Sequence, residues 1–268
     1  MRYFLHISYS GTNYRGWQMQ KGGVLSVQEV IEKNLSQVFK KPIYVVGCGR
    51  TDAQVHASQY FLHFQLEDSW DFDLIFRLNK MLPSDISVFD IIQVEPKQHA
   101  RFGATKRTYD YFIHTYKDPF LKNISTLYTE YKLDLHKMGK AVALLTSYVD
   151  YHAFCKTPSA HSSTLCTISE ATLYSNLAGD RIRFQITSNR FLRGMIRIIV
   201  GKLLLIGSGQ MTVGEFEALL ISKKTPAEFD VAHPQGLFLS EVEYPFLSIP
   251  QKSSFSAFQQ NGEWIKIS

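Results

Sequence analysis

The sequence predicts an α+β protein made of two ferredoxin-like halves. Of its 268 residues, 45% are hydrophobic, which is enough to build a sizeable core. In the first half, apolar residues recur with strand and helix periods in the order strand, helix, strand, strand, helix, strand. A similar order of elements follows in the second half. We therefore expect a joined, mainly antiparallel sheet with a central cleft, formed by residues 1–100 and 101–245, and a C-terminal tail over 246–268.

In the first half, turn and cap residues mark where the elements begin and end. Ser26 and Glu29 form a capping-box pattern, and the apolar residues behind it have a helical spacing that stops before Pro42. In the strand expected over 58–66, the apolar side chains alternate and should share one face. The expected elements are strands over 3–9, 43–48, 58–66 and 86–94, a helix over 27–39, and a second helix from a cap at Asp71 to Met81.

The second half contains an unusually apolar helix. Residues 191–206 are apolar nearly all round, which predicts a buried helix with Arg197 in its middle. The longest apolar stretch is shorter than the roughly 20 residues that cross a bilayer, and the N-terminus shows no secretory signal. We therefore expect a cytoplasmic protein without a membrane segment. The other expected elements are strands over 108–116, 168–175, 181–188 and 236–244, a helix over 135–148, and an extra helix capped by Thr212 and Glu215.

The distribution of charge indicates a polyanionic partner. The formal net charge is only +5, but residues 1–28 and 181–202 contain basic residues and no acid. Acidic residues gather instead between positions 67 and 90. A basic surface separated from an acidic one suits a nucleic acid as partner.

The cysteines argue against a disulfide framework and against a metal site. The sequence has 3 cysteines and no Cys-x-x-Cys pair, which fits a reducing compartment. The set His152, Cys155, His161 and Cys166 has no standard zinc spacing, and serine, threonine and proline fill the interval. We therefore expect a loop there, and no metal.

The polar stretch 49–57 is the first candidate site. It lies between two expected strands and contains Asp52, so rigid elements would hold a carboxylate on a short loop. The alternative is that Asp52 makes an ordinary Asx turn, with Gly49 relaxing the backbone beside it. The residues alone leave both readings open.

Two basic segments are further candidates. Arg190, Arg193 and Arg197 have spacings that would place them on one helical stripe, where they could reach solvent or phosphates, or Arg197 could pair with Asp52. In 101–111, basic residues are interleaved with Tyr109 and a second tyrosine, a pattern that can grip a nucleic acid backbone and stack a base. The same tyrosines also alternate as in an ordinary strand. The cations of that segment are Arg101, Lys106 and Arg107.

These segments together resemble the tRNA pseudouridine synthase A family. Residues 49–57 are similar to its Gly-Arg-Thr-Asp-Ala-Gly-Val-His signature, 101–111 to its Arg-Phe-x-Ala-x-x-Arg-x-Tyr-x-Tyr segment, and 191–201 to its Phe-x-x-x-Met-Val-Arg-x-x-Val-Gly segment. Shorter matches extend the resemblance from about residue 3 to residue 245. It implies the pseudouridine synthase fold.

The resemblance also implies an activity and a set of roles. Members convert uridine to pseudouridine in the anticodon stem-loop, at about positions 38 to 40 of the tRNA, after flipping the base. The roles carried over are the catalytic aspartate at Asp52, a tyrosine against the substrate base at Tyr109, and an arginine contacting the aspartate at Arg197. Arg50 could fill the space that the flipped base leaves, and other cations would hold phosphates. The family implies a homodimer without cofactor; the alternative from another class is a non-catalytic RNA-binding protein or tRNA folding helper of the same fold.

The sequence departs from the family pattern at Gln54 and Ser10. Gln54 stands where the family usually has glycine, and Ser10 stands where it usually has aspartate. Because Arg50, Thr51 and Asp52 are intact beside it, we expect Gln54 to adopt an ordinary backbone conformation, in which glycine would only add unfolded-state entropy.

Overall fold

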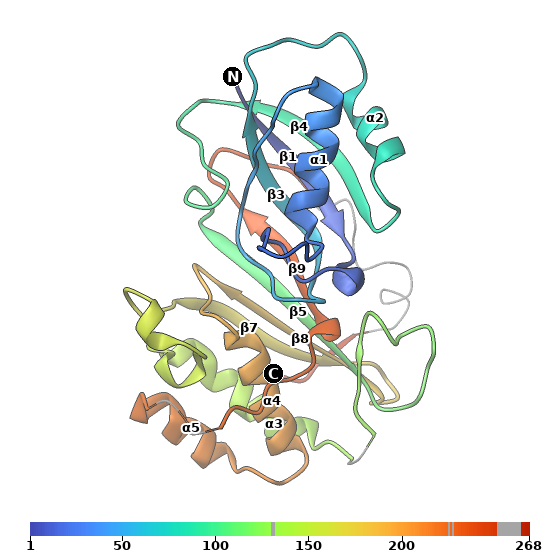
Figure 1. The fold of residues 1–268 in the computed structure, drawn as a ribbon. Coiled ribbons are helices and arrows are strands. Elements are labelled where there is room, and N and C mark those ends of the chain that lie inside the picture. Colours follow the sequence, from blue (N-terminus) through green and yellow to red (C-terminus); the bar gives the residue numbers. More distant parts are fainter. Residues whose placement is uncertain (130–131, 225, 227, 251–263) are drawn as a thin grey trace. The chain divides into compact units, whose positions relative to one another are not determined.

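The computed structural model describes residues 1–129, 132–224, 226, 228–250 and 264–268, and they form two compact units (Figure 1). The first unit contains Met1–Thr105 and residues 238–250; the second contains Lys106–Leu237 and residues 264–268. Each unit consists of a sheet with helices packed on one face. The α+β class predicted from the sequence is confirmed.

The first unit has the element order that the sequence predicts. Its elements are β1 (Arg2–Tyr9), α1 (Val27–Phe39), β2 (Val46–Gly47), β3 (His56–Gln65), α2 (Leu74–Met81), β4 (Ile86–Val94) and β9 (Leu237–Glu243). The strands run β2-β3-β1-β4 with antiparallel neighbours, which is the ferredoxin-like arrangement, and β9 adds in parallel to β3. Helices α1 and α2 lie side by side on one face of this sheet (Figure 1).

The core of the first unit lies on both faces of its central strands. In β3 every residue from His56 to Phe64 is buried, so both faces of the strand are covered. One face packs under the helices, and the other carries Phe61, whose ring contacts that of Tyr244 at 5.4 Å. Many antiparallel sheets have one face in solvent, but here both faces of β3 are covered, so alternation in its sequence does not identify a solvent face.

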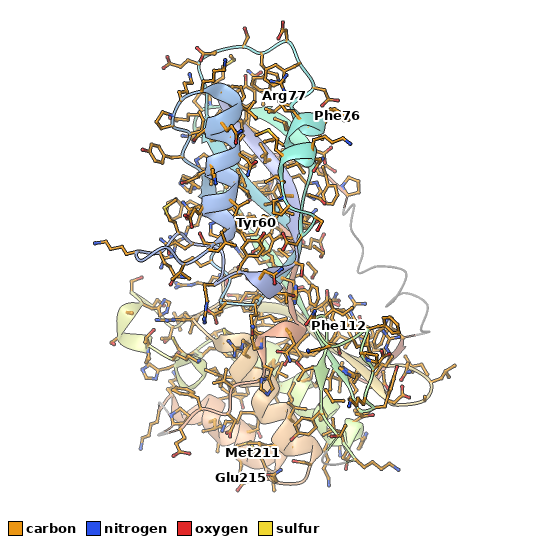
Figure 2. All side chains as sticks on the ribbon, turned by 45° about the vertical axis from the view of Figure 1, so that its right-hand side comes forward. Tyr60, Phe76, Arg77, Phe112, Met211 and Glu215 are labelled. Atoms are coloured by element: carbon orange, nitrogen blue, oxygen red, sulfur yellow. The ribbon has the colours of Figure 1, made fainter. Side chains whose placement is uncertain are left out.

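The second unit is built around β5, β7 and β8. Its strands are β5 (Lys106–His114), β6 (Thr126–Leu127), β7 (Ile168–Ser175), β8 (Arg181–Ser188) and β10 (Ile265–Lys266), and its helices are α3 (Leu135–Leu144), α4 (Met195–Gly207) and α5 (Val213–Ser222). The strand order is β10-β7-β8-β5, antiparallel throughout, with β6 parallel to β5. The α5 capping box predicted from the sequence is present, with Glu215 (Figure 2) and Thr212 bonded to each other's backbone N–H groups.

Several predicted boundaries were wrong for identifiable reasons. The strand expected over 43–48 shortens to β2, because side chains of α1 take its backbone N–H groups: Glu32 Oε1 accepts from Val45 at 2.9 Å. The cap of α2 is Asp73, whose side chain accepts from Phe76 N at 2.9 Å, and not Asp71. The helix expected over 135–148 is α3 followed by a 3-10 turn at Leu145–Ser147.

The helix expected over 191–206 begins later than predicted. Gly194, with φ +74°, is the N-cap of α4, and the first helical residue is Met195. Arg190 and Arg193 therefore precede the helix, and the predicted stripe with Arg197 does not form. The prediction that this helix is buried is confirmed. Within the described residues, none of the helices combines the length and apolarity that a membrane span requires.

The C-terminal tail includes a strand that the sequence did not reveal. Phe255 and Phe258 of the tail lie outside the described residues, but Trp264 contacts Phe112 (Figure 2), with ring centroids 6.3 Å apart. The next residues form β10, which pairs with the edge of β7. Ile267 N then donates to Leu173 O at 2.8 Å, so the chain end is fixed to the second unit.

Candidate functional site

Asp52 lies in the connection between β2 and β3, on a loop that is hydrogen-bonded to the connection between β1 and α1. Trp17 N donates to Thr51 O at 3.2 Å, and Gln54 N donates to Tyr14 O at 3.1 Å. These two backbone hydrogen bonds flank Asp52, whose side chain is half-buried. The carboxylate is therefore carried on a fixed backbone between strands.

Gly16 allows the backbones to approach at this point. Its φ is +95°, and a Cβ built on it would lie 2.4 Å from Thr51 O and 3.1 Å from the carbonyl carbon of Asp52. Contacts under 3 Å would force the loop away, so only glycine permits this packing. The residue matters to the loop although it is distant from it in sequence.

Aromatic side chains form the floor of the Asp52 loop. The hydroxyl of Tyr60 (Figure 2) donates to Gly49 O at 2.6 Å, and its ring packs on Trp17 with centroids 4.2 Å apart. The hydroxyls of Tyr9 and Thr51 are hydrogen-bonded at 2.8 Å. Because these groups are buried, their hydrogen bonds are strong constraints on where the loop can lie.

His56, the last polar residue of the signature, is a structural anchor. It is buried, its ring stacks on Phe238 at 4.4 Å, and its Nδ1 accepts from Gly11 N at 3.1 Å. Accepting through Nδ1 places the ring proton of neutral His56 on Nε2. Ser10, the second departure from the family pattern, places its Oγ 3.4 Å from the same Nδ1.

The expectation for Gln54 was wrong. Its φ is +63°, in the left-handed region, and its side chain is exposed. Two other non-glycine residues share this conformation among those described, Lys40 and Lys223, and both are helix C-caps. The loop thus keeps the backbone conformation that glycine favours, and the glutamine adopts it at an energetic cost.

Tyr109 lies on β5 in the second unit and is buried. Its ring meets that of Phe191 edge-on, with centroids 5.1 Å apart. Tyr111, two residues along the strand and so on the same face, donates its hydroxyl to His233 O at 2.7 Å. Burial raises the pKa of Tyr111 well above its usual range, so its hydroxyl remains a donor.

Arg197 is held against the segment that precedes β9. Its Nε donates to Ala232 O at 2.7 Å, and its backbone carbonyl accepts from Ala232 N at 3.0 Å. One turn later, a Cβ on Gly201 would lie 2.0 Å from Asp230 O, so this close contact requires glycine. Lys202, nearly buried, completes the attachment with a 2.6 Å ion pair to Asp230. The guanidinium is therefore half-buried and oriented by the segment 230–233.

The remaining basic candidates divide between the two units. Arg50 and Arg101 belong to the first unit and are exposed, and Arg101 lies 5.6 Å from the Phe102 ring centroid. Those in the second unit are Lys106, Arg107, Arg190 and Arg193, of which Lys106 and Arg193 are exposed and the others half-buried. Asp52 and Arg50 thus share one loop, and Tyr109 and Arg197 share the other unit.

Sequence reasoning missed two carboxylates that organise these regions. Asp85, in the turn before β4, accepts from Tyr14 OH at 2.6 Å. Asp110, buried in β5, accepts from Arg183 Nε at 2.7 Å and from Gln185 Nε2 at 3.1 Å. Neither pair has a helical or hairpin spacing in the sequence, so no local signal could have identified them. Across the described part of the chain, no group of three or more His, Cys, Asp or Glu side chains is arranged to hold a metal ion.

Comparison with known proteins identifies the family. Residues 141–245 match the family profile described as tRNA pseudouridine synthase. The chain is 41% identical to the tRNA pseudouridine synthase A of Bacteroides thetaiotaomicron, over 97% of this chain and 98% of that protein. It is 40% identical to the protein of the same name from Parabacteroides distasonis, over 91% and 96%, and 38% identical to that from Porphyromonas gingivalis, over 91% and 97%. Identity at this level across nearly the full length of both chains, together with the ferredoxin-like order of the first unit, leads to one conclusion: the chain belongs to the tRNA pseudouridine synthase A family of isomerases.

Proposed function

We propose that the protein isomerises uridine to pseudouridine in the anticodon stem-loop of tRNA, at about positions 38 to 40, with Asp52 as the catalytic carboxylate. The observation that carries this proposal is the loop itself. The half-buried Asp52 lies between two backbone hydrogen bonds that fix its loop, and the loop packs on aromatic side chains, of which Tyr60 donates a hydrogen bond to Gly49 O. Loops held in this way are where rigid scaffolds place catalytic groups.

The reaction rearranges the uracil without changing its composition. The C1′–N1 bond breaks, a C1′–C5 bond forms, the C5 proton leaves, and N1 ends with a proton. No atom or electron is gained or lost, so the chemistry needs neither a redox cofactor nor a metal. Attack at C1′, attack at C6 and removal of a sugar proton each require a carboxylate beside the nucleotide, and in this proposal Asp52 is that carboxylate.

Other residues take supporting roles in this proposal. Tyr109 stacks on the uracil and assists removal of the C5 proton, and Arg197 takes part in substrate binding. Arg50, exposed on the same loop as Asp52, occupies the space that the flipped base leaves. Phosphates are held by Arg101, Lys106, Arg107, Arg190 and Arg193. We also propose that the protein acts in the cytoplasm as a homodimer.

The test is release of tritium from tRNA transcripts labelled at C5 of uridine. Asp52→Asn preserves the shape of the side chain and removes its charge, so we expect turnover to be abolished and tRNA affinity to be retained. Asp71→Asn, which changes an exposed aspartate in the same unit, is the matched control and should leave the rate unchanged. Tritium release near the wild-type rate in Asp52→Asn would exclude Asp52 as the catalytic group.

Two further measurements test the rest of the proposal. Chemical mapping of pseudouridine in the product tRNA should locate the modified base at positions of about 38 to 40, in a stem-loop from which it must be flipped. Turnover should persist in EDTA; loss of activity that zinc restores would contradict the metal-free mechanism.

A further inference from the structure

Asp85 binds one segment of the chain through three hydrogen bonds. Its backbone carbonyl accepts from Ser10 N at 2.8 Å, its Oδ2 from Asn13 Nδ2 at 3.1 Å, and its Oδ1 from Tyr14 OH at 2.6 Å. Asp85 stands in the turn between α2 and β4, whereas the donors belong to the connection between β1 and α1. One residue thus ties together two connections that are more than 70 positions apart.

The connection between β1 and α1, which Asp85 binds, is also hydrogen-bonded to the Asp52 loop. Tyr14 donates its hydroxyl to Asp85 and accepts at its backbone carbonyl from Gln54 N, at 3.1 Å. Trp17 N donates to Thr51 O, next to Asp52. Tyr14 is only 3% exposed, so its ring cannot swing into solvent without breaking the packing around it.

The buried Tyr14 hydroxyl is held as a hydrogen-bond donor to Asp85. Burial, and then the hydrogen bond and the negative charge of Asp85, raise the pKa of Tyr14 well above its usual range. The hydroxyl therefore keeps its proton and remains a donor. A hydroxyl donating to a carboxylate is among the stronger hydrogen bonds in proteins.

We propose that Asp85 is a positioning residue for the Asp52 loop, and that it acts through Tyr14. The inference rests on the proposed role of Asp52. Asp85 is hydrogen-bonded to Ser10, Asn13 and Tyr14. The Tyr14 carbonyl and, three residues later, the Trp17 N–H are hydrogen-bonded to the Asp52 loop and fix its position. Loss of the hydrogen bond between Tyr14 and Asp85 should leave the sheet intact and allow the Asp52 carboxylate to move. Misplacement of a catalytic group by about 1 Å can lower the rate by up to about a hundredfold.

The experiment compares rate and binding in a set of matched variants. Tyr14→Phe removes only the hydroxyl, Asp85→Ala removes the acceptor, and the double variant tests whether they act together. Asp85→Asn keeps an Oδ1 acceptor for Tyr14 and is the conservative variant. Tyr148→Phe is the control, because the Tyr148 hydroxyl makes the same kind of bond, to Glu217 Oε1 at 2.8 Å, in the second unit. Single-turnover tritium release, tRNA Kd and Tm are measured for each.

We expect Tyr14→Phe and Asp85→Ala each to slow single-turnover release about tenfold or more, with the tRNA Kd changed by less than about twofold. The double variant should be no slower than the slower single variant, and Asp85→Asn should recover most of the rate. Tyr148→Phe should react at the wild-type rate.

Three results would overturn the proposal. These are wild-type rates in both single variants, additive losses in the double variant, or an equal loss in the control, which would indicate general destabilisation. The proposed function is tested separately by Asp52→Asn. If Asp52→Asn is inactive and Tyr14→Phe reacts at the wild-type rate, only the positioning role of Asp85 is refuted. If Asp52→Asn is active, the proposed function of Asp52 is refuted.

Discussion

Replacing Gln54 by glycine should stabilise the protein without disabling it. Gln54 holds φ at +63°, where a Cβ costs about 1–2 kcal/mol. Glycine removes that cost but adds unfolded-state entropy worth about 0.4–1 kcal/mol. The side chain is exposed, so no packing is lost, and the N–H bond to Tyr14 O is a backbone bond that glycine keeps.

The net gain in the free energy of unfolding from Gln54→Gly is therefore about 0.8 kcal/mol, the difference between the midpoints of these two ranges. For a chain of this size it corresponds to a rise in Tm of about 1–4 °C. Because Asp52 is held on both sides by hydrogen bonds that do not involve the Gln54 side chain, turnover should stay within about twofold of wild type. Thermal unfolding and tritium release measure the two quantities.

The chain supplies matched controls for this experiment. Lys40 and Lys223 adopt the same left-handed conformation at the ends of α1 and α5, with φ of 53° and 52°. Lys40→Gly and Lys223→Gly should raise Tm by a similar amount and leave turnover unchanged, whereas Gln54→Ala keeps the Cβ and should gain nothing. A lower Tm in Gln54→Gly, or an equal gain in Gln54→Ala, would refute the argument from backbone conformation.

Three further predictions concern stability. Burial, followed by the charges of Arg2 and His99, lowers the pKa of His63 to about 4. The unfolded chain therefore binds the proton at a higher pH than the folded chain, and Tm should fall as pH drops from about 6.5 to about 4. The same dependence of Tm on pH in His63→Gln would contradict this. Asp230→Ala leaves the nearly buried Lys202 without its ion-pair partner and should cost about 2 kcal/mol by thermal unfolding. The double variant Lys202→Met/Asp230→Ala should recover part of that loss, and no recovery would show that the charge is not the cause. Deleting residues 264–268 removes β10 and leaves the edge of β7 uncovered. The free energy of unfolding should fall by about 2 kcal/mol, and the variant should self-associate in sedimentation experiments. A monodisperse variant with an unchanged Tm would refute a role for β10.

The sequence alone predicted most of the elements and identified the candidate catalytic loop. Periodicity located α1, β4, β7 and β8 with their observed bounds, because each is long enough for its pattern to repeat and has caps or turns beside it. The Asp52 signature is contiguous in the chain, so its letters suffice to recognise it. Alternation did not reveal that both faces of β3 are buried, since that depends on what packs against the sheet.

Only the tertiary structure decided what holds the candidate site. The attachment of Tyr14 to Asp85, the approach of Gly16 to Thr51 and the contact of Arg197 with Ala232 join residues that are tens of positions apart. The positive φ of Gln54 has the same origin, because the loop is shaped by the segment it packs against and not by its own letters. Local propensity acts over a few neighbouring residues, whereas these contacts arise when the folded chain brings distant segments together.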